Sequence, residues 1–379
     1  MNDNILNIQI SGIRKFAEKV KNVEGAISLT IGQPDFNVPC SVKSAMIDAI
    51  NENKTSYTSN AGIEELREEI SKYLKTIGIK YDKDEIILTI GGSEGLYAAF
   101  SALLSKKDKI LIPTPAYPAY ENISKILGAD VINYDLNSDF SVNINNIKEK
   151  IKFNKDIKYL MLSFPSNPTG ALMTYENMKE LIEIIKENNL YVIDDGMYAS
   201  IIFDKYYSVA QDEDLKNQVI YISGFSKMFS MTGLRIGYVA CGKKILKEIS
   251  KVHQYGVSCA PSISQYGALE GLKNCRSDVE NMRKIFENRK NYCMKRLKEL
   301  GFDVNEPKGA FYIFPSIKKF NMTSEKFCEK LLTEGKVGCV PGSAFGKGGE
   351  GYMRISYCYS DDTLKEAFDR IEIFLAKLK

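Results

Sequence analysis

The sequence predicts an α/β protein with a mainly parallel central sheet, helices on both faces, and a smaller α+β part. Short apolar runs typical of buried strands alternate with helical patterns between residues 85 and 278. This alternation is typical of strand–helix–strand units, whose helices cross over a parallel sheet. After residue 278 the alternation stops and a long charged helix pattern begins. Because ligands of open parallel sheets bind beyond the carboxyl ends of the strands, we expect the functional site there.

The chain begins before this alternation with a few separate elements. Residues 11–20 have the spacing of an amphipathic helix, and residues 26–31 have a strand pattern that runs into a Gly-Gln-Pro-Asp turn. Helical spacing returns at residues 41–51 and 63–77. We expect the polar segment around Tyr57, which separates these two helices, to be irregular.

The remaining elements follow from the same patterns. Residues 178–186 form the clearest helix of the alternating part, with Thr174 as a possible N-cap. Three units are predicted: an N-terminal arm with part of the small domain (1–44), a large domain (45–278) and a C-terminal small domain (279–379). The expected strands lie at 85–90, 109–113, 130–134, 159–164, 191–194, 219–223 and 352–357, and the later helices at 279–300, at 324–332 and at the end.

Composition indicates a protein that acts on small molecules. The 379 residues are 44% apolar, and 51 basic and 48 acidic residues leave a net charge of +3. No basic block typical of a nucleic-acid surface occurs, so we expect no nucleic-acid partner. The start has no basic region followed by an apolar run, and no run of about 18 apolar residues exists. We therefore expect a cytoplasmic protein that neither binds nor crosses a membrane.

The cysteines and the single histidine exclude several kinds of site. Eight cysteines are scattered without a Cys-x-x-Cys pair, so we interpret them as small apolar core residues without disulfides. His253 is the only histidine, which disfavours zinc sites built on several histidines. It is also the only possible base of a Ser-His-Asp triad, although a structural role is favoured. No metal is expected.

One segment, residues 222–238, carries the strongest chemical signal. Lys227 lies among small, polar and apolar residues, and Arg235 follows eight positions later in a Gly-x-Arg-x-Gly frame. An apolar setting and a nearby fixed cation both lower the pKa of a lysine amine, which then serves as a nucleophile. An arginine cannot titrate and anchors phosphate permanently. An aldehyde-binding lysine and a phosphate-binding arginine would together hold pyridoxal 5′-phosphate; a surface lysine and a turn arginine are the alternative.

Two glycine-rich segments differ in their context. Residues 91–95, Gly-Gly-Ser-Glu-Gly, follow a predicted strand and open a helix, where free backbone N–H groups suit a phosphate. Ser93 can add a hydroxyl. Residues 346–351 formally match Gly-x-Gly-x-x-Gly, but they precede a strand and lie outside any strand–helix–strand unit, so we reject a dinucleotide site.

Polar residues also end two successive predicted strands. Asn167 lies between turn prolines after one strand, and Asp194, Asp195 and Tyr198 follow the next. A carboxylate at this edge can hold a pyridine nitrogen protonated, so that the ring accepts electrons. Asn167 and Tyr198 could both bond the phenolate oxygen of the same ring.

Together these motifs resemble those of fold-type I, class I/II aminotransferases, which use pyridoxal 5′-phosphate. The resemblance is carried by Ser-Gly-Phe-Ser-Lys and Met-Thr-Gly-Leu-Arg-Ile-Gly in residues 223–237, and by Asn-Pro-Thr-Gly at 167–170. It covers the whole chain. The segments 11–16 and 251–265 are similar to those of the N-acetyl-diaminopimelate/aromatic aminotransferase branch.

The resemblance implies a role for each matching residue. Lys227 would bind the cofactor aldehyde, and Tyr117 would stack on the ring. Asp195 would face the pyridine nitrogen. The implied phosphate ligands are Gly92, Ser93, Glu94 and Arg235, with Ser226 as a further candidate, together with Tyr57 from the neighbouring subunit of a homodimer with shared active sites. The implied substrate-binding residues are Gly32, Asn167 and Arg354, of which Arg354 would bind the α-carboxylate.

Two positions depart from the family pattern. Many relatives have Asp-Glu before x-Tyr, whereas this chain has two aspartates; the spacing to Tyr198 favours Asp195, with Asp194 as the alternative. The usual serine three positions before the lysine is Gly224 here. A serine contact to the phosphate must therefore come from Ser223 or Ser226, or be absent.

The implied reaction is transfer of an amino group from an L-amino acid to a 2-oxo acid, with 2-oxoglutarate as the expected acceptor. A β-lyase that breaks a carbon–sulfur bond is the alternative, and a non-catalytic module is disfavoured because the lysine is present. We expect aromatic, dicarboxylic or diaminopimelate-type donors. Four aromatic residues could line the donor pocket: Tyr57, Tyr117, Phe311 and Tyr312. The basic pair Arg14 and Lys15 could bind a distal carboxylate; the alternative is that both side chains are merely solvated.

Overall fold

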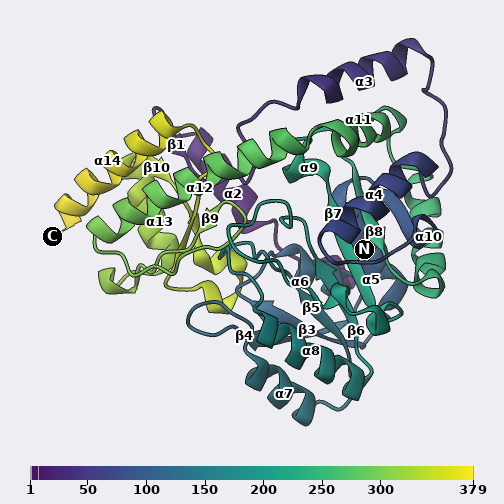
Figure 1. Ribbon diagram of the computed structural model, residues 1–379. Helices are drawn as coiled ribbons and strands as arrows, with labels where there is room; N and C mark the ends of the chain where they lie inside the picture. The colour runs from purple at the N-terminus through teal and green to yellow at the C-terminus, as the bar shows by residue number, and fades with distance from the viewer. Residues whose placement is uncertain (1, 7, 379) are drawn as a thin grey trace.

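A seven-stranded sheet forms the centre of the computed structural model, which describes residues 2–6 and 8–378 (Figure 1). Its strand order is β2-β8-β7-β6-β5-β3-β4, and all neighbours are parallel except at β8, which is antiparallel to β2 and β7. The predicted α/β class is confirmed. The strands are β2 (Ile86–Thr89), β3 (Lys109–Thr114), β4 (Asp130–Asp135), β5 (Ile157–Leu162), β6 (Tyr191–Asp195), β7 (Val219–Gly224) and β8 (Gly237–Ala240).

Helices cover both faces of this sheet because alternate strand residues point to opposite sides. On β6, Ile193 packs in a core cluster with α5, α6 and α10, whereas Val192 packs in a second cluster with α4, α7, α8 and α11. Asp194 and Asp195, which end β6, therefore point to opposite faces. The helices are α4 (Glu64–Thr76), α5 (Gly91–Leu103), α6 (Ala119–Ile126), α7 (Ile144–Phe153), α8 (Tyr175–Asn188), α10 (Lys243–Val257) and α11 (Ser262–Asn274).

The C-terminal third forms a separate apolar core together with residues from near the N-terminus. Phe16 and Val20 of α2 pack in the cluster that contains the buried faces of the last three long helices. β1 (Ile27–Ser28) pairs in parallel with β10 (Val337–Gly338), and a small antiparallel sheet has the order β11-β12-β9. The other elements here are α2 (Gly12–Lys21), α12 (Arg276–Glu299), α13 (Ser324–Gly335), α14 (Asp361–Leu378), β9 (Tyr312–Ile313), β11 (Val340–Pro341) and β12 (Met353–Ser356).

One helix crosses a predicted domain boundary. α3 (Cys40–Asn51) passes residue 44, and its Val42 packs in the core of the large sheet. Figure 1 shows α3 beside α11, away from the C-terminal helices. The remaining short elements are α1 (Asp3–Leu6), α9 (Phe225–Met228) and the 3-10 turns Lys83–Glu85, Val209–Gln211, Glu213–Leu215, Lys318–Phe320, Gly342–Phe345 and Lys347–Gly349.

Some local expectations need correction. The glycine-rich segment 91–95 is itself helical, because it forms the first turn of α5, which begins at Gly91. β8 was missed, since Gly-Tyr-Val-Ala is short and half of it has low strand preference. The N-cap at Thr174 is confirmed, because its hydroxyl accepts a hydrogen bond from the Asn177 N–H.

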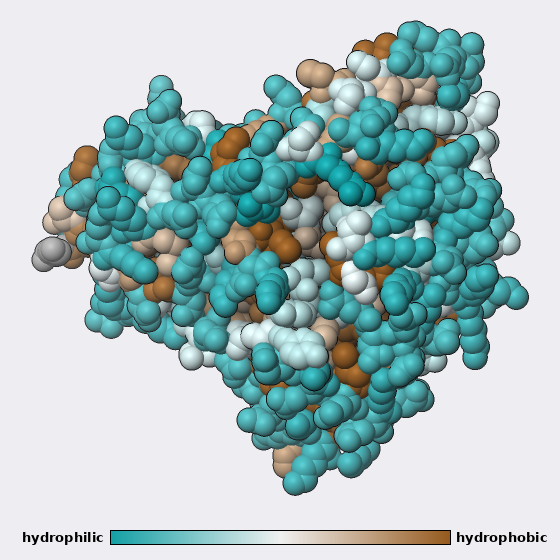
Figure 2. Space-filling model, viewed as in Figure 1, coloured by the Kyte–Doolittle hydropathy of each residue, from teal (hydrophilic) through white to brown (hydrophobic). Residues whose placement is uncertain are grey.

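The surface seen in Figure 2 is mostly hydrophilic, and hydrophobic residues gather around a recess at the middle of this face. Within residues 2–6 and 8–378, none of the helices combines the length and apolar character that a membrane span requires.

Candidate active site

A cavity of about 470 Å³ lies at the carboxyl edge of the large sheet, and its size is typical of small-molecule sites. Strand ends of the large sheet form one wall, and α2, the residues after β1, and β12 form the other. Eleven of the thirteen predicted site residues line it: Gly32, Gly92, Ser93, Tyr117, Asn167, Asp195, Tyr198, Ser226, Lys227, Arg235 and Arg354.

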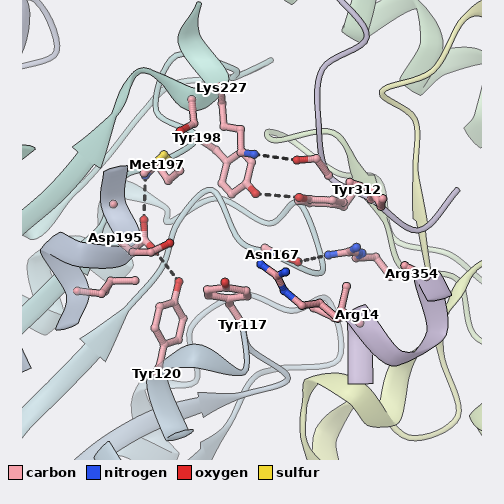
Figure 3. Close-up of a pocket in the computed structure, with 18 of the residues that line it drawn as sticks. Arg14, Tyr117, Tyr120, Asn167, Asp195, Met197, Tyr198, Lys227, Tyr312 and Arg354 are labelled. Atoms are coloured by element: carbon pink, nitrogen blue, oxygen red, sulfur yellow. Dashed lines mark hydrogen bonds between the residues drawn. The ribbon is translucent and has the colours of Figure 1, made fainter. Parts of the chain in front are cut away.

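Lys227 reaches into the cavity from α9, the short helix that follows β7 (Figure 3). Its Nζ donates a hydrogen bond to the Gly32 carbonyl oxygen at 2.7 Å. Burial, together with the nearby guanidinium groups of Arg235 and Arg354, lowers the pKa of this amine to about 8. About a tenth of the amine is therefore uncharged at pH 7, so Lys227 has the property that a nucleophilic or basic lysine needs.

The two aspartates that end β6 have different surroundings. Asp195 lines the cavity, where its Oδ2 accepts from the Tyr120 hydroxyl at 2.7 Å and its Oδ1 from the Met197 N–H at 3.0 Å (Figure 3). Burial raises its pKa, and these two hydrogen bonds lower it. Asp194 points to the other face and accepts from the Ser208 hydroxyl; burial raises its pKa to about 7. Only Asp195 is placed to face a ligand.

The start of α5 and Arg235 form a positive end of the cavity. Gly92 and Ser93 lie in the first turn of α5, where free N–H groups and the helix dipole favour an anion. The Arg235 guanidinium lies directly over Gly91, since a Cβ at Gly91 would come within 2.5 Å of Nη2. Ser226 lines the same cavity, whereas the Ser223 hydroxyl donates to the Gly196 carbonyl. This end of the cavity is suited to a phosphate.

Arg354 is nearly fully buried, with 2% of its surface exposed. Its Nη1 donates to Asn167 Oδ1 at 2.8 Å, and its Nη2 donates to the Thr30 carbonyl. Among the described residues, nothing accepts a hydrogen bond from Nε. A buried guanidinium with a free donor and no carboxylate beside it is suited to bind an anionic ligand.

Aromatic side chains complete the cavity. Tyr117 and Tyr120 pack edge to face, with ring centroids 5.6 Å apart. The hydroxyls of Tyr198 and Tyr312 lie 2.8 Å apart, and burial raises the pKa of Tyr198. Tyr312 lies so close to Gly32 that a Cβ at position 32 would be 1.8 Å from its hydroxyl. The glycine is therefore required at that position.

Two predicted residues lie outside the cavity. Glu94 does not line the cavity, and its carboxylate turns toward α10. Tyr57 is 89% exposed and lines separate surface hollows with Ser56 and neighbouring residues. It cannot line the cavity of its own chain in this position.

Several cavity residues were not predicted. Tyr120, the second residue of α6, follows Tyr117 by three positions, and the two rings pack against each other. Met197 contacts Asp195 through its backbone and also lines the cavity. Of the basic pair, Arg14 lines the cavity, whereas Lys15 lies on a different surface hollow.

The comparisons with known proteins identify the family of the chain. A family model described as aminotransferase class I and II matches residues 24–371. The chain belongs to the class I and II aminotransferase family. A probable N-acetyl-LL-diaminopimelate aminotransferase of Bacillus subtilis is 45% identical, covering 100% of this chain and 96% of its own. An aspartate aminotransferase of Pyrococcus horikoshii is 39% identical, covering 98% of this chain and 96% of its own.

A solved structure supports the same assignment. The aromatic aminotransferase from Pyrococcus horikoshii OT3 superposes with a TM-score of 0.91 at 37% identity, covering 96% of this chain and 100% of that one. The chain is thus an aminotransferase, as expected from its motifs. The alternative of a carbon–sulfur β-lyase is not favoured.

Proposed function

We propose that this aminotransferase uses pyridoxal 5′-phosphate, held between the strand ends and α5. The residues present fit that group. Arg235 and the first turn of α5 offer a cradle for its phosphate, and Gly91 leaves the room that the Arg235 side chain needs. Because burial raises the pKa of Asp195, a positive ring nitrogen beside it would stabilise its ionised form. When bound, the cofactor supplies an electron-accepting ring that stabilises negative charge on the substrate Cα.

Lys227 performs the proton transfer. Its amine would bind the cofactor aldehyde, and the free amine would accept the proton from the Cα of the bound amino acid. A pKa of about 8 lets the same nitrogen release that proton again near neutral pH. Tyr198 and Asn167 would donate to a ring oxygen and Tyr117 would cover the ring, and all three line the same cavity. The convergence of Lys227 with Asp195 in one cavity carries the proposal.

The proposed substrates are an L-amino acid and a 2-oxo acid, with 2-oxoglutarate as acceptor. Arg354 binds the α-carboxylate that all of them carry, with Asn167 and Gly32 beside it. Arg14 enters the cavity from α2 toward Asn167 and Tyr117 (Figure 3). No hydrogen bond or ion pair engages its guanidinium within residues 2–6 and 8–378, although Glu18 of the same helix also lines the cavity. Arg14 is thus available for a distal carboxylate.

This arrangement favours a broad enzyme for dicarboxylic, aromatic and diaminopimelate-type donors. The names of the relatives cover the same range, since they include aspartate, aromatic and N-acetyl-LL-diaminopimelate aminotransferases. An arginine beside tyrosines can bind a carboxylate, and it can also stack on an aromatic ring.

We further propose a homodimer in which Tyr57 reaches the phosphate site of the neighbouring subunit. The proposal is supported by the exposure of Tyr57, which is 89% exposed and lies outside the cavity of its own chain.

A donor panel with 2-oxoglutarate tests the function. Glutamate should form from aromatic and diaminopimelate-type donors, and 2-oxoglutarate should form from glutamate when an aromatic 2-oxo acid is the acceptor. Release of pyruvate and ammonia without glutamate would contradict transfer. Activity confined to alanine or to a small branched donor would contradict the donor proposal but not the cofactor proposal.

A further inference from the structure

Two side chains remain without a role in the site described above. His253 is the only histidine of the chain, has 0% of its surface exposed, and lies on α10. Glu94 belongs to the first turn of α5 but turns away from the cavity that its neighbours Gly92 and Ser93 line. These two side chains meet each other where α10 packs against α5.

The contacts define which group donates. Nδ1 of His253 lies 3.2 Å from Oε1 of Glu94 and 3.3 Å from Oε2. A carboxylate oxygen accepts hydrogen bonds, so the hydrogen between them belongs to Nδ1. Within the described part of the chain, Nε2 of the same ring is buried without a hydrogen-bond partner. The only polar contact that the ring makes there is therefore with Glu94.

Glu94 also contacts the backbone at the start of α5. Its Oε2 also accepts from the Ile90 N–H at 3.1 Å. Ile90 is the residue before the helix and has no side chain that could cap the free N–H groups of the first turn. The carboxylate of Glu94 thus caps the start of α5 on the side of the helix that faces away from the cavity.

The position of Glu94 also has an electrostatic consequence. A carboxylate in the first turn is attracted by the positive end of the helix, as a phosphate is. If Glu94 were free to turn toward the cavity, it would compete with the phosphate for Gly92 and Ser93. The hydrogen bond from His253 holds the carboxylate away from that position.

We propose that His253 is a positioning residue for phosphate binding: it fixes Glu94, which in turn fixes the first turn of α5 in the form that accepts the cofactor phosphate. The proposal rests on the proposed use of pyridoxal 5′-phosphate. It differs from a purely structural role in one respect, because it predicts an effect on phosphorylated ligands only.

The test measures binding to the full-length chain stripped of cofactor, by titration calorimetry. Pyridoxamine 5′-phosphate and pyridoxamine are suitable probes, since neither carries the aldehyde that reacts with Lys227 and they differ only in the phosphate. His253→Leu removes the donor, whereas His253→Asn keeps an N–H close to the position of Nδ1. His253→Leu should bind pyridoxamine 5′-phosphate about tenfold more weakly, the size expected for one hydrogen bond to a charged group. Pyridoxamine affinity should stay unchanged, and His253→Asn should recover most of the loss.

Glu94→Ala provides a second variant in case the buried leucine impairs folding, because the Glu94 side chain is partly exposed. It should show the same selective loss, and combining it with His253→Leu should add little. Equal losses for both probes, or an unchanged affinity with a lowered unfolding temperature, would overturn the proposal. If the wild-type chain does not bind pyridoxamine 5′-phosphate, the proposed cofactor itself is wrong.

Discussion

The two walls of the cavity are built in different ways. On one wall the polar residues come directly from the large sheet: Asp195 ends β6, Lys227 follows β7, and Asn167 lies in the turn after β5. The opposite wall combines α2, the residues after β1, and β12, which lie at the two ends of the chain. Arg354 on that wall donates to Thr30, which is 324 positions away in the sequence.

The two walls therefore have different roles: the sheet wall carries the groups for the reaction, and the opposite wall carries the groups that bind the substrate. Strand ends are held by ladder hydrogen bonds on both sides, so they fix the groups that transfer protons and balance charge. The opposite wall depends on the packing of α2 residues such as Phe16 against the C-terminal core. It carries Arg14 and Arg354, the cations that we assign to substrate carboxylates. We therefore expect substitutions on the sheet wall to lower turnover with every substrate. Substitutions of Arg14 should instead change which substrate is preferred.

Lys227→Ala should have the largest effect. Without the amine that binds the aldehyde and moves the Cα proton, turnover should fall at least about ten-thousandfold with every donor, as for loss of other covalent nucleophiles. The variant should still bind pyridoxamine 5′-phosphate, because the phosphate contacts remain. Steady-state rates with an aromatic and a dicarboxylic donor measure the loss. Borohydride reduction of the wild type, followed by peptide mass spectrometry, should place the cofactor on Lys227; an adduct on another lysine ends this assignment.

Asp195→Asn should follow, with Asp194→Asn as the matched control on the other face of the same strand. Loss of the charge beside the ring nitrogen should lower turnover at least about a hundredfold for all donors, the size typical of one preorganised electrostatic group. Asp194→Asn should change turnover little, because that carboxyl contacts Ser208 and does not line the cavity. Rates of the two variants with the same donors decide between them. The reverse order of effects would mean that the ring nitrogen faces Asp194.

The sheet wall could largely be predicted from the sequence because each of its motifs lies within a few residues of a strand. Strand periodicity and turn residues then place Lys227 and Asp195 at one edge without further information. The alternation along β6 also accounts for the choice between its two aspartates, since Asp195 shares a face with Ile193, which packs against α5 and α10. β8 was missed because its four residues carry a weak strand signal.

Other features could not be predicted because they depend on which side of a helix is covered. Consecutive helical residues point about 100° apart. Ser93 faces the cavity and Glu94 faces α10, although they are neighbours in the sequence. In the same way Arg14 faces the cavity and Lys15 does not, since the orientation of α2 is set by the burial of Phe16. These directions follow only from contacts between distant segments.

Arg14→Ala, with Lys15→Ala as the control on the adjacent position of α2, tests whether the second wall sets the choice of donor. For glutamate, kcat/KM should fall about tenfold, since one hydrogen bond between charged groups is lost. For phenylalanine it should change little, and Lys15→Ala should leave both values near those of the wild type. A comparison of kcat/KM ratios for the two donors measures the effect. An equal loss for both donors would place Arg14 with the general machinery of the sheet wall.

Tyr57→Phe should have the smallest effect. It tests whether a second chain contributes a residue to the cavity. If Tyr57 reaches the phosphate in the neighbouring subunit, loss of its hydroxyl removes one hydrogen bond, and affinity for pyridoxamine 5′-phosphate should fall about fivefold. Tyr255→Phe is a suitable control, because Tyr255 is equally exposed (88%) but has no expected phosphate contact. Light scattering should show a dimer for the wild type and for both variants, since neither hydroxyl is needed for association. A wild-type chain that stays monomeric and fully active in dilute solution would show that the site is complete within one chain, and Tyr57 would then have no part in it.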